Sequence, residues 1–407
     1  MKMIQQLMIT NVRIHTMNDA DSVIENGYIY VREGKIADLG KMTAMPKYNI
    51  LRRDFGGADI CPGFVDAHTH LGLFGDAVGM EDTDGNEDSD PITPQLNVLD
   101  AVNTGTAYFQ EALAAGVTTA VISPGSTNPI AGQIAAVKTY CAKGQTRRID
   151  DRVIATPAAM KFALGENPKS TYNDKDQMPV TRMAIAAMIR EMLEKAKRYE
   201  QQKSRYEADP DNEDEPEYDQ KCEAMLPLMR RQIAAHFHAH TVDDICTALR
   251  IAKEYQLRAV IVHATEGHEI SEILRDECEG VLSGPILTDR SKPELKGQTA
   301  ASAGQMAAAG VKTALITDHP EIPLNYLPLC AALAVRGGMD KEEALRAITI
   351  TPARICGIDD RVGSVEKGKD ADLVVYKGTP FDITCPPIAV IAGGRIVSQE
   401  SEAKDSR

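Results

Sequence analysis

Alternating apolar and polar positions mark short strands near both ends of the chain. Residues 7–14 and 27–31 follow the pattern of strands, and the second run turns at a Glu-Gly pair into a third. Near the other end, residues 371–376 predict a strand, and residues 388–397 predict a hairpin around two glycines. Because neither end holds enough strands to form a core easily, we expect both ends to share one sheet domain.

Between these ends, apolar runs alternate with amphipathic helical stretches. The runs at 116–122, 153–155, 257–263 and 313–318 predict strands. Thr241, followed by acidic residues, predicts the start of a helix. Repeated units of strand and helix place the chain in the α/β class and are typical of a (β/α)8 barrel. A doubly wound sheet is the alternative, but no Gly-x-Gly-x-x-Gly motif follows any strand.

Two polar segments interrupt this pattern. Residues 80–94 form an acidic, turn-rich stretch directly after a strand of the predicted barrel, where they would act as a lid or substrate gate, or as a plain solvated loop. A long helix is expected from near Thr181, and the acidic stretch 207–219 follows it. We expect a charged, mobile excursion around residues 200–222.

Composition narrows the class of partners. The chain has 407 residues, of which 43% are hydrophobic and 26% charged, and these values are ordinary for a globular protein. Its net charge of −14 argues against a nucleic-acid partner, since phosphate binding needs a basic face. A homo-oligomer is compatible with this composition.

Cysteine usage and hydropathy bear on location. The 8 cysteines form no Cys-x-x-Cys pair, which is typical of free thiols in a reducing compartment. The first residues lack the apolar core of a signal peptide, and no apolar run is long enough to span a bilayer. We therefore expect a cytoplasmic protein without a membrane partner.

Histidines gather at the predicted strand ends of the central region. Residues 62–70 read Pro-Gly-Phe-Val-Asp-Ala-His-Thr-His, a turn and then a strand that ends in His68 and His70. Because side chains alternate along a strand, these two imidazoles lie on the same side. Three further strand ends carry metal-binding side chains, namely His236, His238 and His240 on one, His263 on the next and Asp318 on the last.

These four strand ends predict a metal site. The carboxyl ends of barrel strands face the active site. Polar side chains buried there are costly unless they bind something, and imidazole and carboxylate groups are common zinc ligands. A single terminal histidine would be typical of a hydrogen-bonded structural residue, whereas four such strands together indicate a metal.

The chain resembles the amidohydrolase superfamily, in particular its imidazolonepropionase-like branch. This resemblance implies a distorted (β/α)8 TIM-type barrel with a small β-sandwich domain built from both chain ends. On that basis we expect the barrel to span 62–354 and the sandwich to combine 1–61 with 355–407. The resemblance covers nearly the whole chain and rests on residues 62–70, 116–119, 238–240, His263, 317–320, 351–354 and 363–375.

The same resemblance implies a divalent metal centre with two ions per chain, zinc or alternatively manganese or iron. His68, His70 and Asp318 would hold one metal. His238 and His263 would hold the other. His240 shares the face of His238 and is the second choice of ligand, His236 is expected in the core, and His319 is a less certain ligand or substrate contact.

A pair of metals usually needs a bridging anion, and the family often uses a lysine carboxylated by CO2. Lys161 is our candidate, because it lies in an apolar stretch where a bare ammonium would be costly. Glu166 is the alternative bridge. A single-metal site with Lys161 reaching the surface would also fit the sequence.

The reaction implied is hydrolysis of a C–N bond in a small molecule such as a cyclic amide, an N-acyl amino acid or a dipeptide. Paired metals generate hydroxide near neutral pH, and Asp318 would carry the proton to the leaving nitrogen. Arg290 is a candidate clamp for a substrate carboxylate. The alternatives are a ring deaminase, disfavoured because Thr241 stands where deaminases place a glutamate, and a non-catalytic scaffold.

Overall fold

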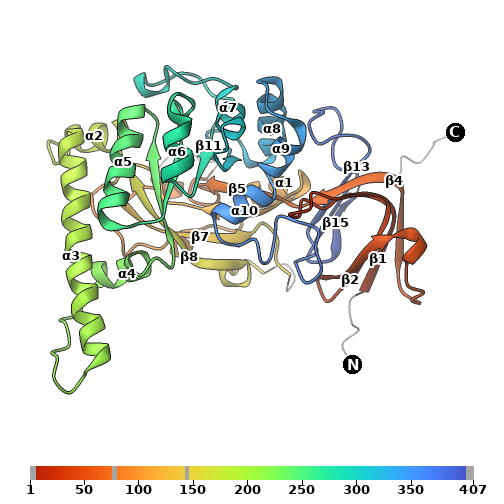
Figure 1. Ribbon diagram of the computed structural model, residues 1–407, viewed down its shortest axis with the longest axis horizontal. Coiled ribbons are helices and arrows are strands. Elements are labelled where there is room, and N and C mark those ends of the chain that lie inside the picture. Colours follow the sequence, from red (N-terminus) through yellow and green to blue (C-terminus); the bar gives the residue numbers. More distant parts are fainter. Residues whose placement is uncertain (1–5, 76–79, 143–145, 400–407) are drawn as a thin grey trace.

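The computed structural model describes residues 6–75, 80–142 and 146–399 (Figure 1). The first five residues of the predicted sandwich domain, and its last ones from 400 onward, lie outside the described parts. The described chain contains two sheets with a row of helices beside the larger one.

Strands from both chain ends hydrogen-bond into one seven-stranded sheet, as the alternating patterns predict. The order is β15-β14-β13-β4-β1-β2-β3. The strands are β1 (Gln6–His15), β2 (Val23–Arg32), β3 (Lys35–Lys41), β4 (Arg52–Pro62), β13 (Leu373–Tyr376), β14 (Ala389–Ala392) and β15 (Arg395–Gln399).

This sheet curls around a core of its own. Ile29 of β2 and Ile391 of β14 belong to the same buried cluster although their strands lie far apart in the sheet order. The amide of Ile36 also donates to the carbonyl of Lys369 at 2.9 Å, which joins the two chain ends outside the strand ladder. The predicted sandwich is therefore, in the described residues, one continuous curled sheet.

The second sheet has eight strands in the order β5 to β12, and it nearly closes into a barrel. Across the gap between its edges, the amide of His70 donates to the carbonyl of His319 at 2.8 Å. The strands are β5 (Phe64–Thr69), β6 (Val117–Ile122), β7 (Ile130–Lys138), β8 (Val153–Ala163), β9 (Ala234–Ala239), β10 (Ala259–His263), β11 (Gly280–Ser283) and β12 (Thr313–Leu315).

One strand of the barrel departs from the predicted repetition of strand and helix. β7 runs antiparallel to both β6 and β8, whereas the other neighbouring pairs are parallel. Residues 123–129 between β6 and β7 contain no helix, and such a short connection can join antiparallel strands but not parallel ones. The repetition of strand and helix is therefore interrupted in this part of the barrel, which is a distortion of the (β/α)8 arrangement.

Helices α5 to α8 stand in a row along one side of the barrel (Figure 1). The hydroxyl of Thr241 accepts from the amide of Asp244 at 3.3 Å, which confirms the predicted cap of α5. The helices are α1 (Tyr108–Ala114), α2 (Glu166–Asn173), α3 (Arg182–Ala208), α4 (Gln220–Met229), α5 (Val242–Tyr255), α6 (Ser271–Glu277), α7 (Ser302–Ala308), α8 (Leu327–Arg336), α9 (Lys341–Arg346) and α10 (Ile350–Ile355).

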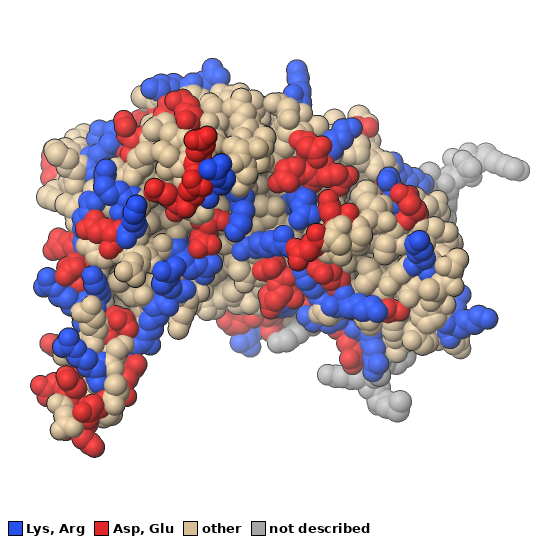
Figure 2. All heavy atoms as spheres, viewed as in Figure 1, with Lys and Arg blue, Asp and Glu red and all other residues tan. Residues whose placement is uncertain are grey.

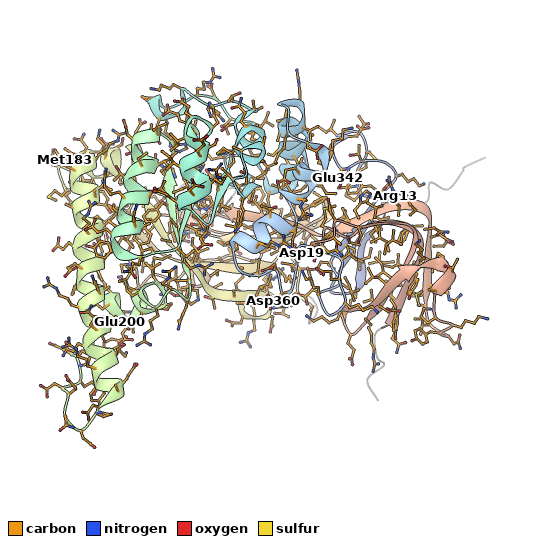
Figure 3. The ribbon with its side chains drawn as sticks, in the orientation of Figure 1. Arg13, Asp19, Met183, Glu200, Glu342 and Asp360 are labelled. Atoms are coloured by element: carbon orange, nitrogen blue, oxygen red, sulfur yellow. The ribbon has the colours of Figure 1, made fainter. Side chains whose placement is uncertain are left out.

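The expected mobile excursion around residues 200–222 is largely a helical hairpin. α3 continues to Ala208, and α4 starts at Gln220, so only the turn between them lacks regular structure. Glu200, labelled in Figure 3, pairs across the hairpin with Arg230 at 3.6 Å. The charges that suggested an excursion are compatible with a helix because a buried apolar stripe, formed by Ile185, Ile189, Met192, Leu193 and Ala196, attaches α3 to the barrel.

Ion pairs connect the barrel to the curled sheet. Asp19, labelled in Figure 3, pairs with Arg354 of α10. The buried ammonium of Lys138 at the end of β7 lies 2.6 Å from Asp372, beside β13. Because β4 ends at Pro62 and β5 begins at Phe64, we keep the domain boundary near residue 61 as a proposal.

The outer surface carries charges of both signs. On the face shown in Figure 2, Lys and Arg side chains are interspersed with Asp and Glu. Among the helices in the described ranges, none is both long and apolar enough to cross a membrane.

Candidate metal centre

Three donors converge where β5 and the chain after β12 meet. Oδ1 of Asp318 lies 3.3 Å from Nε2 of His68 and 3.3 Å from Nε2 of His70. His68 is fully buried, and His70 nearly so. Asp318 follows β12 by three residues and has a φ of 54°, a strained conformation of the kind that functional residues often adopt. We call these three residues the first triad.

Asp66 holds the two sides of the first triad together. It lies two residues before His68 on β5, and its carboxylate accepts from the amide of His68 at 3.1 Å. Its other oxygen accepts from the amide of Thr317 at 3.1 Å and from the hydroxyl of Thr317. Burial raises the pKa of Asp66 to about 7, although the bonds from Thr317 oppose that rise. Asp66 thus links β5, which carries His68, to Thr317, the residue before Asp318.

A second triad stands beside the first. His238 and His240 lie at the end of β9, and His263 ends β10. One ring nitrogen of each residue lies within 4.8 Å of the others. The rings of His68 and His263 meet edge to face with centroids 5.7 Å apart, so the two triads are adjacent.

The hydrogen bonds of these imidazoles fix their tautomers. Nδ1 of His70 lies 2.7 Å from the carbonyl of Ser123, and Nδ1 of His263 lies 2.8 Å from the carbonyl of Gly284. Because a carbonyl can only accept, both Nδ1 atoms carry the proton and both Nε2 atoms keep a lone pair. Metal-binding histidines in proteins are commonly oriented in this way.

The other two histidines of the second triad are oriented by hydroxyl groups. Nδ1 of His238 lies 3.0 Å from the hydroxyl of Ser126, and Nδ1 of His240 lies 2.7 Å from the hydroxyl of Thr265. Nε2 of His238 is buried and has no hydrogen-bond partner among the described residues. A buried lone pair without a partner is costly, and a bound cation removes that cost.

Burial keeps the histidines neutral, which is the form that binds metal. It lowers the pKa of His263 to about 4, although Asp318 opposes this shift. The pKa values of three more imidazoles fall well below 6.5, again mainly through burial, and these belong to His68, His238 and His240. Three neutral imidazoles in each other's reach form one donor set, and two imidazoles beside the carboxylate of Asp318 form another, and both sets fit a divalent ion such as zinc.

Lys161 lies at the junction of the triads. Its side chain is fully buried on β8, and Nζ lies 3.3 Å from Nε2 of His68. Burial lowers the pKa of Lys161 to about 7, although Asp318 opposes the shift. His236 pairs with Lys161 in the strand register and is buried deeper in the barrel, as expected of a core residue.

A cavity of about 300 Å³ opens onto both triads. Phe74 and Asn86 contribute to its wall, so the acidic segment 80–94 does reach the mouth of the barrel. The amide of Asn128 holds this segment by donating to the carbonyl of Glu87. The rest of the wall includes Ser126, Thr127, Asn167, Thr288, Asp289, Ser291, Lys292 and Leu295.

Arg290, in the loop after β11, does not lie where a clamp for a substrate carboxylate was predicted. Its side chain is exposed and donates to the carbonyl of Gln298 at 2.8 Å, and it does not line the cavity. Lys292, two residues later, does line the cavity and donates to Asn167 at 2.7 Å. The loop has no regular repeat, so the sequence did not indicate which of its cations faces inward.

Two further candidates lie outside both triads. Gly165, with a φ of 85°, turns the chain from β8 into α2 and carries Glu166 to the wall of another cavity, so Glu166 does not stand between the triads. His319 is buried, and its ring packs edge to face against Tyr108 with centroids 4.4 Å apart.

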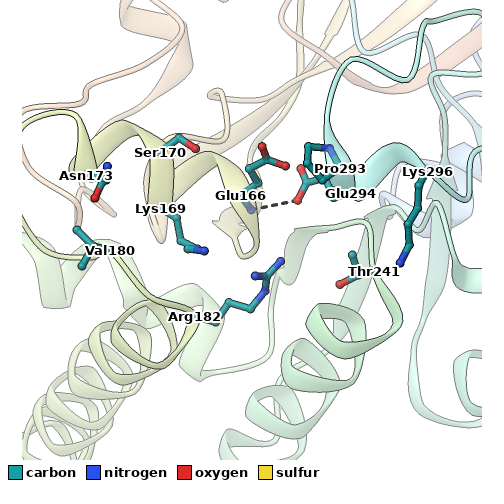
Figure 4. A pocket seen from close by; sticks show the side chains of 10 residues that line it. All are labelled: Glu166, Lys169, Ser170, Asn173, Val180, Arg182, Thr241, Pro293, Glu294 and Lys296. Atoms are coloured by element: carbon teal, nitrogen blue, oxygen red, sulfur yellow. Dashed lines mark hydrogen bonds between the residues drawn. The ribbon is translucent and has the colours of Figure 1, made fainter.

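Glu294 is the residue that sequence reasoning missed. Its side chain is only 1% exposed, and Oε1 lies 3.6 Å from Nε2 of His240 and 4.0 Å from Nε2 of His238. Oε2 accepts from the amide of Glu166 at 3.0 Å, the dashed line in Figure 4. Burial raises the pKa of Glu294. The residue sits in a single 3-10 turn (Pro293–Leu295) of the segment after β11, which is too short for a periodic pattern to indicate burial.

Comparison with known proteins places this geometry in a family. The family model described as "Amidohydrolase family" matches residues 60–397. A crystal structure of an amidohydrolase from Thermotoga maritima MSB8 is 38% identical, with a TM-score of 0.90, and the match covers 97% of this chain and 100% of that one.

Two curated relatives agree with this assignment. Amidohydrolase tasK of Hapsidospora irregularis is 29% identical over 391 residues, a match that covers 90% of this chain but only 39% of that longer protein. The imidazolonepropionase of Maricaulis maris is 24% identical over 408 residues, which is 91% of this chain and 92% of that protein. The chain therefore belongs to the amidohydrolase family, as an imidazolonepropionase-like hydrolase that acts on carbon–nitrogen bonds.

Proposed function

We propose that this protein is a two-metal amidohydrolase that cleaves an amide C–N bond in a small polar molecule. The observation that carries the proposal is the pair of adjacent donor triads joined at Lys161. The first triad, with Lys161, would hold one ion, and His238, His240 and His263 would hold the other. The relative named imidazolonepropionase supports a substrate of this chemical type.

The bound metal pair would supply Lewis-acid polarisation of the carbonyl and a lowered pKa for the attacking water. Asp318 would move the proton. Contacts with neighbouring imidazoles hold the pKa of Asp318 well below its usual range against the opposing effect of burial, so its carboxylate is ionised before the reaction. The proton would then pass from an oxygen of Asp318 to the leaving nitrogen.

Lys161 would provide the bridging anion as a carbamate. Carbamate formation requires a neutral amine, and a pKa of about 7 leaves a large neutral fraction at physiological pH. The amine would attack CO2 through its nitrogen lone pair and lose one proton, which leaves a carboxylate on Nζ. Of the two bridges considered, Lys161 is favoured because Glu166 points into a separate cavity.

The substrate would carry a carboxylate. Lys292 is the cation of the catalytic cavity, and its ammonium already donates to the amide oxygen of Asn167. A cavity of about 300 Å³ whose wall combines polar side chains with apolar ones such as Phe74 and Leu295 fits an N-acyl amino acid, a dipeptide or a cyclic amide with an acidic side chain.

Replacing Lys292 with methionine tests that assignment. We expect KM to rise about tenfold or more for substrates with a carboxylate, with little change in kcat, because a charge-assisted bond made equally in the ground and transition states is lost. Steady-state kinetics with matched pairs of substrates, with and without the carboxylate, measure this. Arg290→Met is the control and should change neither constant, and equal KM values for Lys292→Met and the unaltered enzyme would rule out the clamp.

A ring deaminase is the alternative reaction. Thr241, at the position of the glutamate expected in deaminases, has its hydroxyl engaged with Asp244 as the cap of α5. It is therefore not a free acid or base for a purine or pyrimidine ring. A non-catalytic scaffold is disfavoured because both donor triads are complete.

An activity screen tests the proposed reaction. The full-length protein, loaded with zinc or manganese, would be assayed against dipeptides, N-acyl amino acids and cyclic amides, with ring amines as the competing class. Release of an amine or carboxylate from the first three classes is the expected result. Ammonia release from ring amines, with no amide cleavage, would contradict the proposal.

A reducing compartment such as the cytoplasm is proposed for this enzyme. All eight cysteines are free thiols in the structure. Four of them, Cys61, Cys222, Cys330 and Cys356, are buried, where they pack as small apolar side chains.

A further inference from the structure

We infer that Glu294 is a ligand of the second metal, so that this ion is held by three imidazoles and one carboxylate. This inference rests on the proposed function, which places a metal between His238, His240 and His263. It adds a negatively charged ligand from the segment after β11, whereas the other ligands stand at strand ends. The loop follows β11 and carries Glu294 over the ends of β9 and β10.

The distances fit a shared ion. Two donors bound at about 2.0–2.2 Å to one tetrahedral metal lie about 3.3–3.6 Å apart. Oε1 of Glu294 is 3.6 Å from Nε2 of His240 and 4.0 Å from Nε2 of His238. The first distance falls at the edge of that range and the second slightly beyond it. Glu294 lies outside the group of donors within 4.8 Å of one another that the three imidazoles form, so its side chain would move toward the triad to bind the ion.

The oxygen that faces the triad lacks a conventional partner. Oε1 is buried and accepts no hydrogen bond from any residue in the described ranges. The nearest ammonium, that of Lys292, is 3.8 Å away and donates its hydrogen bond to Asn167 instead. A carboxylate that is 1% exposed is expected to be paired or to coordinate a metal, and a dication beside Oε1 would meet that need.

The other oxygen is fixed so that Oε1 must face inward. Oε2 accepts from the amide of Glu166, at the start of α2 (Figure 4). A Cβ on Gly165 would lie 2.8 Å from Oε2, so this close approach requires glycine at that position. The carboxylate therefore lies between the second triad and the wall of the larger cavity of about 580 Å³ drawn in Figure 4.

Metal affinity, measured without any substrate, tests this role. The full-length protein is stripped with a chelator and titrated with zinc against a chromophoric competitor. Glu294→Gln keeps an oxygen that accepts from the amide of Glu166 but removes the charge. We expect the second zinc to bind about 100-fold more weakly and the affinity for the first zinc to stay unchanged. Removing a residue that only supports a ligand already costs about 10-fold to 100-fold in metal affinity, and loss of a ligand should cost at least as much.

Glu266→Gln is the matched control. Glu266 is also a buried glutamate whose carboxylate accepts one backbone amide, that of Val242 at 3.0 Å. Its own amide donates to the carbonyl of His240 at 2.9 Å, a backbone bond that the substitution keeps, and its carboxylate lies in neither triad. Both zinc affinities should stay within threefold of the unaltered protein. The melting temperature of each metal-free variant shows whether the fold has changed.

The outcomes separate this inference from the proposed function. Two tight zinc sites in Glu294→Gln would overturn the ligand role while leaving the amidohydrolase proposal intact. An unaltered protein that binds one zinc would overturn the second site itself. Equal weakening of both sites would assign Glu294 a purely structural role. In a His240→Ala background, where the same site is already damaged, Glu294→Gln should weaken zinc binding much less than it does alone.

Discussion

Replacing Asp318 with asparagine is expected to lower kcat about a thousandfold while zinc stays bound. Asparagine keeps an oxygen in the first triad, 3.3 Å from two imidazole nitrogens in the native residue, but it cannot accept a proton. General acid–base catalysis by one residue contributes about 100-fold to 10,000-fold, so the loss should be near the middle of that range. Turnover and metal content of the same preparation measure both effects.

The control for this variant is Asp289→Asn. Asp289 lines the same cavity but is exposed and belongs to neither triad. Its replacement should leave kcat within about threefold, as is usual for a surface change. Retained turnover in Asp318→Asn would remove Asp318 as the proton carrier, and loss of zinc along with activity would make it only a ligand.

Replacing Lys161 with methionine is expected to lower kcat/KM at least 100-fold. Methionine has a similar length and tolerates the buried site, but it cannot form a carbamate, so the anion between the two ions is lost. In Lys161→Ala, which leaves the space of the side chain empty, short carboxylic acids such as propionate should restore part of the activity by supplying an anion. Dose-dependent rescue of turnover, absent for neutral amides of the same size, is the measurement.

The carbamate itself can be observed directly. Unaltered protein incubated with isotopically labelled bicarbonate should show one carbamate resonance that Lys161→Met lacks. Lys169→Met is the control, because Lys169 lines the separate cavity of Figure 4 and should keep both the resonance and the activity. Full activity in Lys161→Met would exclude the bridge and favour a site with one essential metal.

The sequence predicted the residues of the site best where they stand on regular strands. His68 and His70 share a strand face through the period of two, and His263 ends an apolar run, so their convergence follows from the barrel alone. The same periodicity also left His238 and His240 unresolved, and the structure brings both into one triad.

Loops carried the parts that the sequence could not predict. Lys292 and Glu294 point inward from a segment without repeat, while Arg290 between the same strands points outward. β7 (Ile130–Lys138) was not among the predicted strands, so its antiparallel direction was not predicted either. The long helix expected from near Thr181 is confirmed as α3, which ends at Ala208 beside the acidic stretch 207–219.

The metal content of the purified protein tests the central claim most directly. Protein prepared without chelator should contain about two divalent ions per chain by elemental analysis, as a two-metal centre requires. Loss of His68 and His70 should remove one ion, and loss of His238 and His263 the other. A chain that binds no metal in any preparation, or that hydrolyses amides equally well after complete metal removal, would contradict the account.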